Sequence, residues 1–136
     1  MNYKSVFIFF FIFLLGCEQN NLKKNVVNKE TLTRYKNSGF ALVYDTVLKK
    51  EKKISKKIDN RSLLIFHKSL KKNSFVKITN LSNHKTVIAE VISNNVKFSD
   101  FYNSVITLRI AEELSLDLNE PYIDLVLISQ NSTFIA

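Results

Sequence analysis

Two neighbouring stretches, 75–79 and 86–92, constrain most strongly what this chain can fold into. In the first (Phe-Val-Lys-Ile-Thr), apolar and polar residues alternate with period two, as in a strand with one buried face. The second (Thr-Val-Ile-Ala-Glu-Val-Ile) has the composition of a strand. The segment 80–85 between them is polar, and its asparagines are expected to supply the backbone angles that glycine usually provides in turns. The sequence therefore predicts a β-hairpin over 75–92.

Further short strands are expected on both sides of this hairpin. They share apolar runs bounded by polar residues, and they are 39–44, 62–66, 104–107, 122–128 and, as a short edge strand, 131–135. In the last long strand, Ile123, Leu125 and Leu127 alternate along the chain, so they are expected to share one buried face.

One helix is predicted over 108–116, between the last two of these strands. The side chains expected to face inward are Leu108, Ile110, Ala111 and Leu114. Asn119 and Pro121 are expected to end the helix. Short strands in this number, with a single short helix, predict a mainly β domain, and a small β-barrel is the expected architecture.

The amino terminus carries an apolar run that is too short to span a membrane. Residues 6–15 are all apolar, Lys4 precedes them and Gly16 follows. A helix of this length spans about 15 Å, roughly half of the bilayer core. A basic end, an apolar middle and a final small residue are typical of a secretory signal peptide, which is expected here over 1–16.

The sequence Leu-Leu-Gly-Cys at 14–17 resembles the lipobox of bacterial lipoproteins. This resemblance implies that Cys17, the only cysteine, carries the lipid and holds the mature protein on a membrane surface. The Asn- and Lys-rich segment 17–37 is then a flexible tether before a folded domain at 38–136. Glu18 is not the Asp that favours inner-membrane retention, so the expected location is the outer membrane, facing the periplasm. A plain signal peptide with an incidental cysteine is the alternative.

Composition excludes several classes of site. One cysteine cannot form an internal disulfide or a multi-cysteine zinc site, and two glycines cannot make a Gly-rich phosphate loop, so no metal or cofactor is expected. Twenty lysines and arginines against twelve acids give a net charge of +8, which by itself would suit nucleic acid. A periplasmic location makes nucleic acid an unexpected partner.

The positive charge is concentrated in one segment. Residues 49–72 contain ten lysines or arginines and two acids, whereas the rest of the mature chain is close to neutral. The candidate ligand-binding cations in this segment are Lys52, Lys53, Lys56 and Lys57. In the periplasm, their anionic partners would be stem-peptide carboxylates of peptidoglycan or lipid head groups. A Lys-rich compositional bias of the source genome explains the same segment equally well.

The order of short motifs between residues 38 and 128 resembles the rare lipoprotein A (RlpA) family. The matching segments are 39–44 (Gly-Phe-Ala-Leu-Val-Tyr), 66–70 (Phe-His-Lys-Ser-Leu), 75–83 (Phe-Val-Lys-Ile-Thr-Asn-Leu-Ser-Asn), 86–91 (Thr-Val-Ile-Ala-Glu-Val) and 105–114 (Val-Ile-Thr-Leu-Arg-Ile-Ala-Glu-Glu-Leu). The resemblance implies a six-stranded double-psi β-barrel that engages peptidoglycan. Some members of the family are lytic transglycosylases that act on glycan strands lacking stem peptides.

The resemblance also places the candidate catalytic residues. His67 stands at the family's histidine, but Asn94 stands where the family has an Asp, and Lys56 falls near its upstream Glu. An amide neither gives nor takes a proton near neutral pH. Asp100 is a candidate substitute acid. The other titratable candidates, expected to be solvated surface residues, are Asp45, Asp59, His84, Glu112 and Glu113.

Three functions remain open at this point. The first is a lipid-anchored protein that engages peptidoglycan glycan strands with a degenerate catalytic site. The alternative is an active endolytic lytic transglycosylase that uses His67 and a carboxylate such as Asp100. A membrane-associated interaction module without affinity for glycan is the third.

Overall fold

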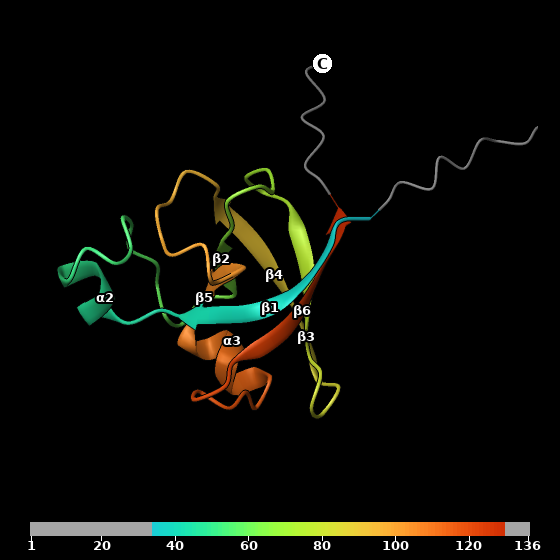
Figure 1. Ribbon diagram of the computed structural model, residues 1–136. Helices are drawn as coiled ribbons and strands as arrows, with labels where there is room; N and C mark the ends of the chain where they lie inside the picture. The colour runs from blue at the N-terminus through green and yellow to red at the C-terminus, as the bar shows by residue number, and fades with distance from the viewer. Residues whose placement is uncertain (1–33, 130–136) are drawn as a thin grey trace, which may run out of the picture. The chain divides into compact units, whose positions relative to one another are not determined.

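The computed structural model describes residues 34–129, which form a closed barrel of six β-strands with two short helices (Figure 1). The predicted signal peptide, Cys17 and the edge strand 131–135 lie outside the described residues. The elements, in chain order, are β1 Lys36–Val43, α2 Thr46–Lys50, β2 Leu64–Phe66, β3 Phe75–Asn80, β4 Thr86–Ser93, β5 Ser104–Ile106, α3 Leu108–Glu113 and β6 Tyr122–Ser129.

The mainly β, six-stranded barrel predicted from the sequence is confirmed. The strands follow the order β1-β5-β2-β4-β3-β6 around the barrel. β1–β5 and β2–β4 pair in parallel, and the other neighbouring pairs are antiparallel. β1 begins at Lys36, so the end of the segment predicted as tether belongs to the barrel. Each of these six strands therefore has a hydrogen-bonded neighbour on both sides, although the short β5 and β2 pair along only part of β1 and β4.

β3 and β4 form the predicted hairpin. Its Cα partners run from Phe75 opposite Glu90 to Thr79 opposite Thr86, and the side chains buried along both strands alternate with exposed ones. In the connecting turn, the residue with left-handed backbone is His84, with a φ of 61°, and not an asparagine as expected. His84 is exposed, as predicted for a residue in this turn.

The asparagines of this turn act through their side chains and hold the end of α3. The Nδ2 groups of Asn80 and Asn83 donate to the Leu114 carbonyl at 3.0 and 2.9 Å. Asn80 is buried, and its Oδ1 accepts the Ser82 N–H at 3.0 Å. A carbonyl that the last turn of α3 leaves without a helical partner is thereby satisfied.

α3 is the predicted helix, but it ends earlier than expected. It stops at Glu113, and Ser115 follows with left-handed backbone, at a φ of 46°. The N–H groups of Ser115 and Leu116 donate to the carbonyls of Glu112 and Ala111, both at 2.9 Å. This is a Schellman ending. The asparagine and proline that were expected to end the helix lie in the connection beyond it.

The inward face of α3 is narrower than predicted. Ile110, Ala111 and Leu114 are buried and join the barrel core, but Leu108 is 37 % exposed, so its prediction is wrong. Leu108 is the first residue of the helix and lies about 200° of helical rotation before Ile110. It therefore points away from the buried face.

α2 is a second helix, so the expectation of a single helix is wrong. It has five residues and none is buried, and hence no apolar periodicity marks it in the sequence. The Asp45 carboxylate caps it by accepting the Val47 N–H at 3.0 Å. Lys49 and Lys50 lie in its last turn, where positive charge is favourable.

Two hydrophobic cores lie on opposite faces of β2 and β5. Ile65 and Ile106 belong to the barrel core, whereas the adjacent Phe66 and Val105 belong to a second core outside the barrel. The other buried members of this second core are Tyr44, Ile54, Ile58, Val96 and Phe98. The second core packs the chain after β1 and the loop before β5 against the barrel wall.

Replacing Ser115 with glycine is expected to stabilise the protein. Left-handed backbone costs an L-residue roughly 1 kcal/mol that glycine avoids, so Ser115→Gly should raise the free energy of unfolding by about 0.5–1 kcal/mol. The matched control, Ser115→Ala, removes the same hydroxyl and its hydrogen bond from Lys85 but keeps the Cβ. Urea unfolding measures both. An alanine variant as stable as the glycine variant would contradict a strained Schellman position.

Candidate functional site

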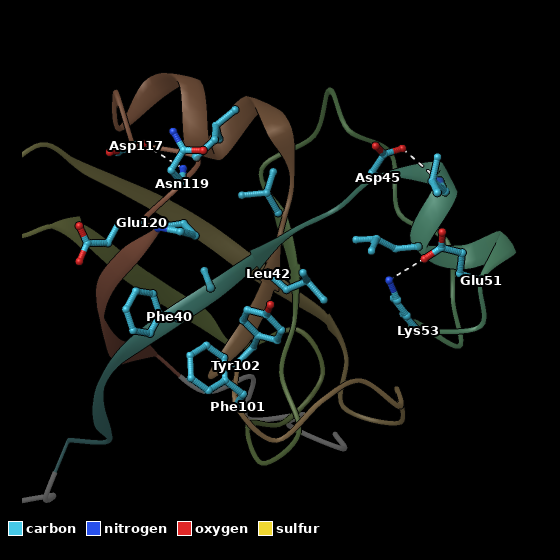
Figure 2. Close-up of a pocket in the computed structure, with 16 residues that line it drawn as sticks. Phe40, Leu42, Asp45, Glu51, Lys53, Phe101, Tyr102, Asp117, Asn119 and Glu120 are labelled. Carbon is cyan, nitrogen blue, oxygen red and sulfur yellow. Dashed lines mark hydrogen bonds and ion pairs between the residues drawn. The ribbon is translucent and has the colours of Figure 1, made fainter.

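An open groove of about 940 Å³ runs beside β1 (Figure 2). Its lining residues come from four segments in three separate regions of the sequence: 40–43 in β1 and the adjacent 45–53 around α2, 101–102 in the loop before β5, and 117–121 before β6. Closure of the barrel brings these segments to one strand. The groove is therefore a product of the tertiary fold.

Four aromatic residues form a platform at this groove. Phe40 stacks against Phe101, with ring centres 5.3 Å apart and planes at 13°. Tyr122 makes a T-shaped contact with Phe40, and Tyr102 makes one with Phe101, with ring centres 5.1 Å apart in each pair. Phe101 is 66 % exposed. The aromatic platform (Phe40, Phe101, Tyr102 and Tyr122) thus offers apolar ring surface to a ligand.

Lys68 holds the loop that carries Phe101 and Tyr102. Its Nζ donates to the Phe98 carbonyl at 2.8 Å, lies 4.5 Å from the centre of the Phe98 ring, and pairs with Asp100. The hydrogen bond and the charge of Lys68 both lower the pKa of the Asp100 carboxyl. Asp100 is therefore ionised near neutral pH and lacks the proton that a general acid must donate.

Carboxylates line the groove on both sides of its apolar centre (Figure 2). Asp117 and Glu120 come from the connection before β6, and Asp45 and Glu51 flank α2. Lys53, the only cation among the described lining residues, pairs with Glu51 at 2.6 Å, and this carboxylate raises the pKa of Lys53. The lining is thus negative in a chain whose net charge is +8.

His67 is buried and fully hydrogen-bonded, and it does not line the groove. It is 2 % exposed, and its Nδ1 accepts the N–H groups of Ser69 and Leu70 at 3.0 and 3.1 Å. We assign the ring proton to Nε2 for this reason, and Nε2 then donates to the Tyr35 hydroxyl at 3.1 Å. Burial lowers the pKa of His67 to about 4.

Ser93, at the end of β4, brings three of the predicted catalytic positions together. Its carbonyl accepts a hydrogen bond from the backbone N–H of His67 at 3.2 Å, and its Oγ accepts one from the Lys56 Nζ at 2.9 Å. Asn94 follows it and is exposed. We call Lys56, His67, Ser93 and Asn94 the Ser93 corner. Within residues 34–129, no carboxylate side chain hydrogen-bonds to any of the four.

The four candidate lysines have separate positions. Lys53 lines the groove, whereas Lys56 reaches the Ser93 corner. Lys52 has left-handed backbone, with a φ of 58°, and Lys52 and Lys57 are both exposed. The chain from Lys53 to Lys56 therefore connects the groove to the Ser93 corner, and the lysines do not form one continuous wall of the groove.

The described part of the chain contains neither a group of three His, Cys, Asp or Glu side chains that could hold a metal ion nor a helix long and apolar enough to cross a bilayer. No protein-family model and no curated protein sequence matches the chain. Inference about function therefore rests on the site geometry and on the motifs.

Sequence reasoning missed the groove and the aromatic platform. Three of the four groove segments are connections between strands, and they meet only when the barrel closes. No local sequence pattern therefore indicates the groove. One signal was available: 98–102 (Phe-Ser-Asp-Phe-Tyr) is rich in aromatic residues for a loop. Phe98 of this run is buried in the second core, and Phe101 is exposed at the groove.

The buried His67 predicts that acid destabilises the fold. Between pH about 6.5 and about 4, the unfolded chain binds a proton at this histidine and the folded chain does not. The free energy of unfolding should therefore fall as the pH decreases through this window, by about 3 kcal/mol in total. Urea unfolding at a series of pH values measures this dependence.

Two asparagine variants isolate the contribution of His67. His67→Asn keeps a hydrogen-bond acceptor near the Nδ1 position but cannot titrate, so its pH profile should be flatter even though the variant is less stable. His84→Asn is the matched control, because His84 is exposed and asparagine tolerates left-handed backbone. If the free energies of unfolding of wild type and His67→Asn depended on pH in the same way, His67 would not be the source of the pH dependence.

Proposed function

We propose that this protein is a lipid-anchored, periplasm-facing protein that binds the glycan strands of peptidoglycan without cleaving them. The observation that carries the proposal is the aromatic platform beside the open groove. Aromatic ring faces are electron-rich, and the C–H groups on one face of a sugar ring are weakly positive, so sugar rings stack favourably on such platforms.

The remainder of the groove lining suits an extended sugar chain. The volume of about 940 Å³ lies near the upper end of the roughly 300–1,000 Å³ that is usual for ligand sites. Apolar side chains such as Leu42, Leu118 and Pro121 alternate in the lining with polar groups such as Asn119. Amide and carboxylate oxygens accept hydrogen bonds from hydroxyl groups, which sugars present in abundance.

The Ser93 corner supports the loss of the family's catalytic acid. Glycoside chemistry needs a carboxylic acid with a raised pKa close to the glycosidic oxygen. The corner presents an amide at Asn94 and an ammonium at Lys56, and His67 contributes its backbone N–H there, because both of its ring nitrogens bond to other residues. Asp100, the candidate substitute, has a lowered pKa, which is the wrong direction for a general acid.

We extend the proposal to the double-psi arrangement of the barrel and to a relationship with the rare lipoprotein A family. Two parallel pairs formed by non-consecutive strands, β1–β5 and β2–β4, support a double-psi arrangement. The meeting of Lys56, His67 and Asn94 at Ser93 is what the motif order of the rare lipoprotein A family would require. We therefore propose a divergent member of that family that has lost its catalytic carboxylates.

Sacculus binding tests the proposed function. The purified chain should sediment with peptidoglycan sacculi, and Phe101→Ala should weaken this binding about 3- to 10-fold, because it removes the most exposed ring of the platform. Ile88→Ala, on β4, is the matched control, because Ile88 is also an exposed apolar residue but does not line the groove. Thermal unfolding verifies that both variants are folded.

Two results would contradict this proposal. Equal loss of binding in the Phe101 and Ile88 variants, or no binding at all, would remove the platform as the glycan site. Release of peptide-free glycan fragments ending in anhydro-muramic acid from amidase-treated sacculi would show that the protein cleaves glycan and would reject the claim that catalysis is lost.

The lipid anchor has its own test. Cells that express the chain should incorporate labelled palmitate into it, and Cys17→Ser should abolish the label and move the protein from the membrane fraction to the soluble fraction, since one thiol carries the diacyl group. The lipobox has one cysteine and the chain has no other. Label that persists in Cys17→Ser would reject lipidation at this residue.

A further inference from the structure

The groove has the opposite charge from the protein that contains it. Residues 34–129 include ten acids and sixteen lysines or arginines. Four of the acids (Asp45, Glu51, Asp117 and Glu120) line the groove, but Lys53 is the only cation among its described lining residues. Carboxylates are therefore gathered at the groove although cations predominate elsewhere. An N-acetylated sugar has no positively charged group that could pair with these carboxylates.

Most of this negative charge is not neutralised within the described part of the chain. Glu51 pairs with Lys53, but Asp45, Asp117 and Glu120 form no ion pair there. One oxygen of Asp45 accepts the Val47 N–H and one oxygen of Asp117 accepts the Asn119 N–H, at 3.0 and 2.9 Å. These bonds fix the position of each carboxylate.

The aromatic platform adds a second, independent attraction for positive charge. Phe40, Phe101 and Tyr102 line the same groove as the carboxylates (Figure 2). The face of an aromatic ring attracts an ammonium group through its quadrupole. A groove that combines exposed ring faces with carboxylates favours a ligand that has both an apolar ring surface and a cationic group.

We propose that the groove selects glycan whose amino sugars have lost their N-acetyl groups and carry free ammonium groups. This inference rests on the proposed function, and it names the substrate class of the same groove. A sugar ring can stack on the platform while its ammonium group meets a carboxylate.

Matched oligosaccharides test the inference directly. Calorimetric titration of the full chain compares a β-1,4-linked glucosamine oligomer with its N-acetylated counterpart of equal length. The titration is carried out at pH about 6, where the sugar amines are largely protonated. We expect the glucosamine oligomer to bind about 5- to 10-fold more tightly at low salt, with the difference shrinking as salt increases.

A double variant assigns this preference to the groove. Asp45→Asn with Glu120→Gln should bring the affinities for the two oligomers to within about 2-fold, mainly by weakening the glucosamine oligomer. Asparagine still caps α2, so the fold is preserved. Glu112→Gln is the control, because Glu112 is an exposed carboxylate of α3 outside the groove, and it should keep the full preference.

The outcomes separate the two proposals. Equal binding of both oligomers by wild type, with Phe101→Ala weakening both, would overturn the preference for free amines and leave the glycan site intact. A preference for the glucosamine oligomer that persists undiminished in the Asp45→Asn/Glu120→Gln variant would also overturn it, because the groove carboxylates would then not be its source. If the protein bound neither of the two oligomers and no sacculus preparation, the proposed function itself would be overturned.

Discussion

β1 is the strand on which the rest of the structure depends, because it closes the barrel. One of its edges pairs in parallel with β5, from Ala41 opposite Ser104, and the other pairs antiparallel with β6, from Lys36 opposite Val126. Closure gives each of the six described strands a neighbour on both sides. It also requires β1 to bury Ala41 in the core while Phe40, the neighbouring residue, stacks on Phe101.

The connections that build the groove are anchored by hydrogen bonds to the backbone of this strand. The Ala41 N–H donates to the Pro121 carbonyl, and the Asn103 N–H donates to the Phe40 carbonyl, both at 2.9 Å. The Tyr44 N–H donates to the Ile106 carbonyl at 2.8 Å, where β1 leaves the barrel toward α2. The aromatic platform is thus held by the barrel scaffold, and a ligand would meet rings whose positions are already fixed.

The parts of the fold that could be predicted are those with a local pattern. Alternation in 75–79, the strand composition of 86–92 and the polar turn between them identified the hairpin, and alternation also identified the buried face of β6. α2 could not be predicted, since five residues without a buried side chain carry no periodicity. Ser115 and His84 occupy left-handed positions where glycine or asparagine is expected, so their turn geometry was hidden.

The candidate site, like the fold, was predictable only where a local motif marks it. The resemblance placed the candidate catalytic positions at His67, at Asn94 and near Lys56; in the structure, the backbone N–H of His67 and the Nζ of Lys56 both bond to Ser93, which precedes Asn94. The sequence could not show that His67 is 2 % exposed, because its burial depends on packing from remote segments. Similarly, the concentration of lysines in 49–72 suggested a basic binding surface, but the groove gathers carboxylates from both sides of β1.

Mapping a bound glycan onto the backbone tests the central claim most directly. Amide chemical shifts of the isotope-labelled chain, followed during titration with an N-acetylglucosamine oligomer, should change at 40–42, 101–102 and 118–120, which line the groove. The amides of 86–90 on β4 should stay unchanged. Changes confined to 52–57 and the Ser93 corner, with none at Phe40 or Phe101, would contradict a glycan site on the aromatic platform.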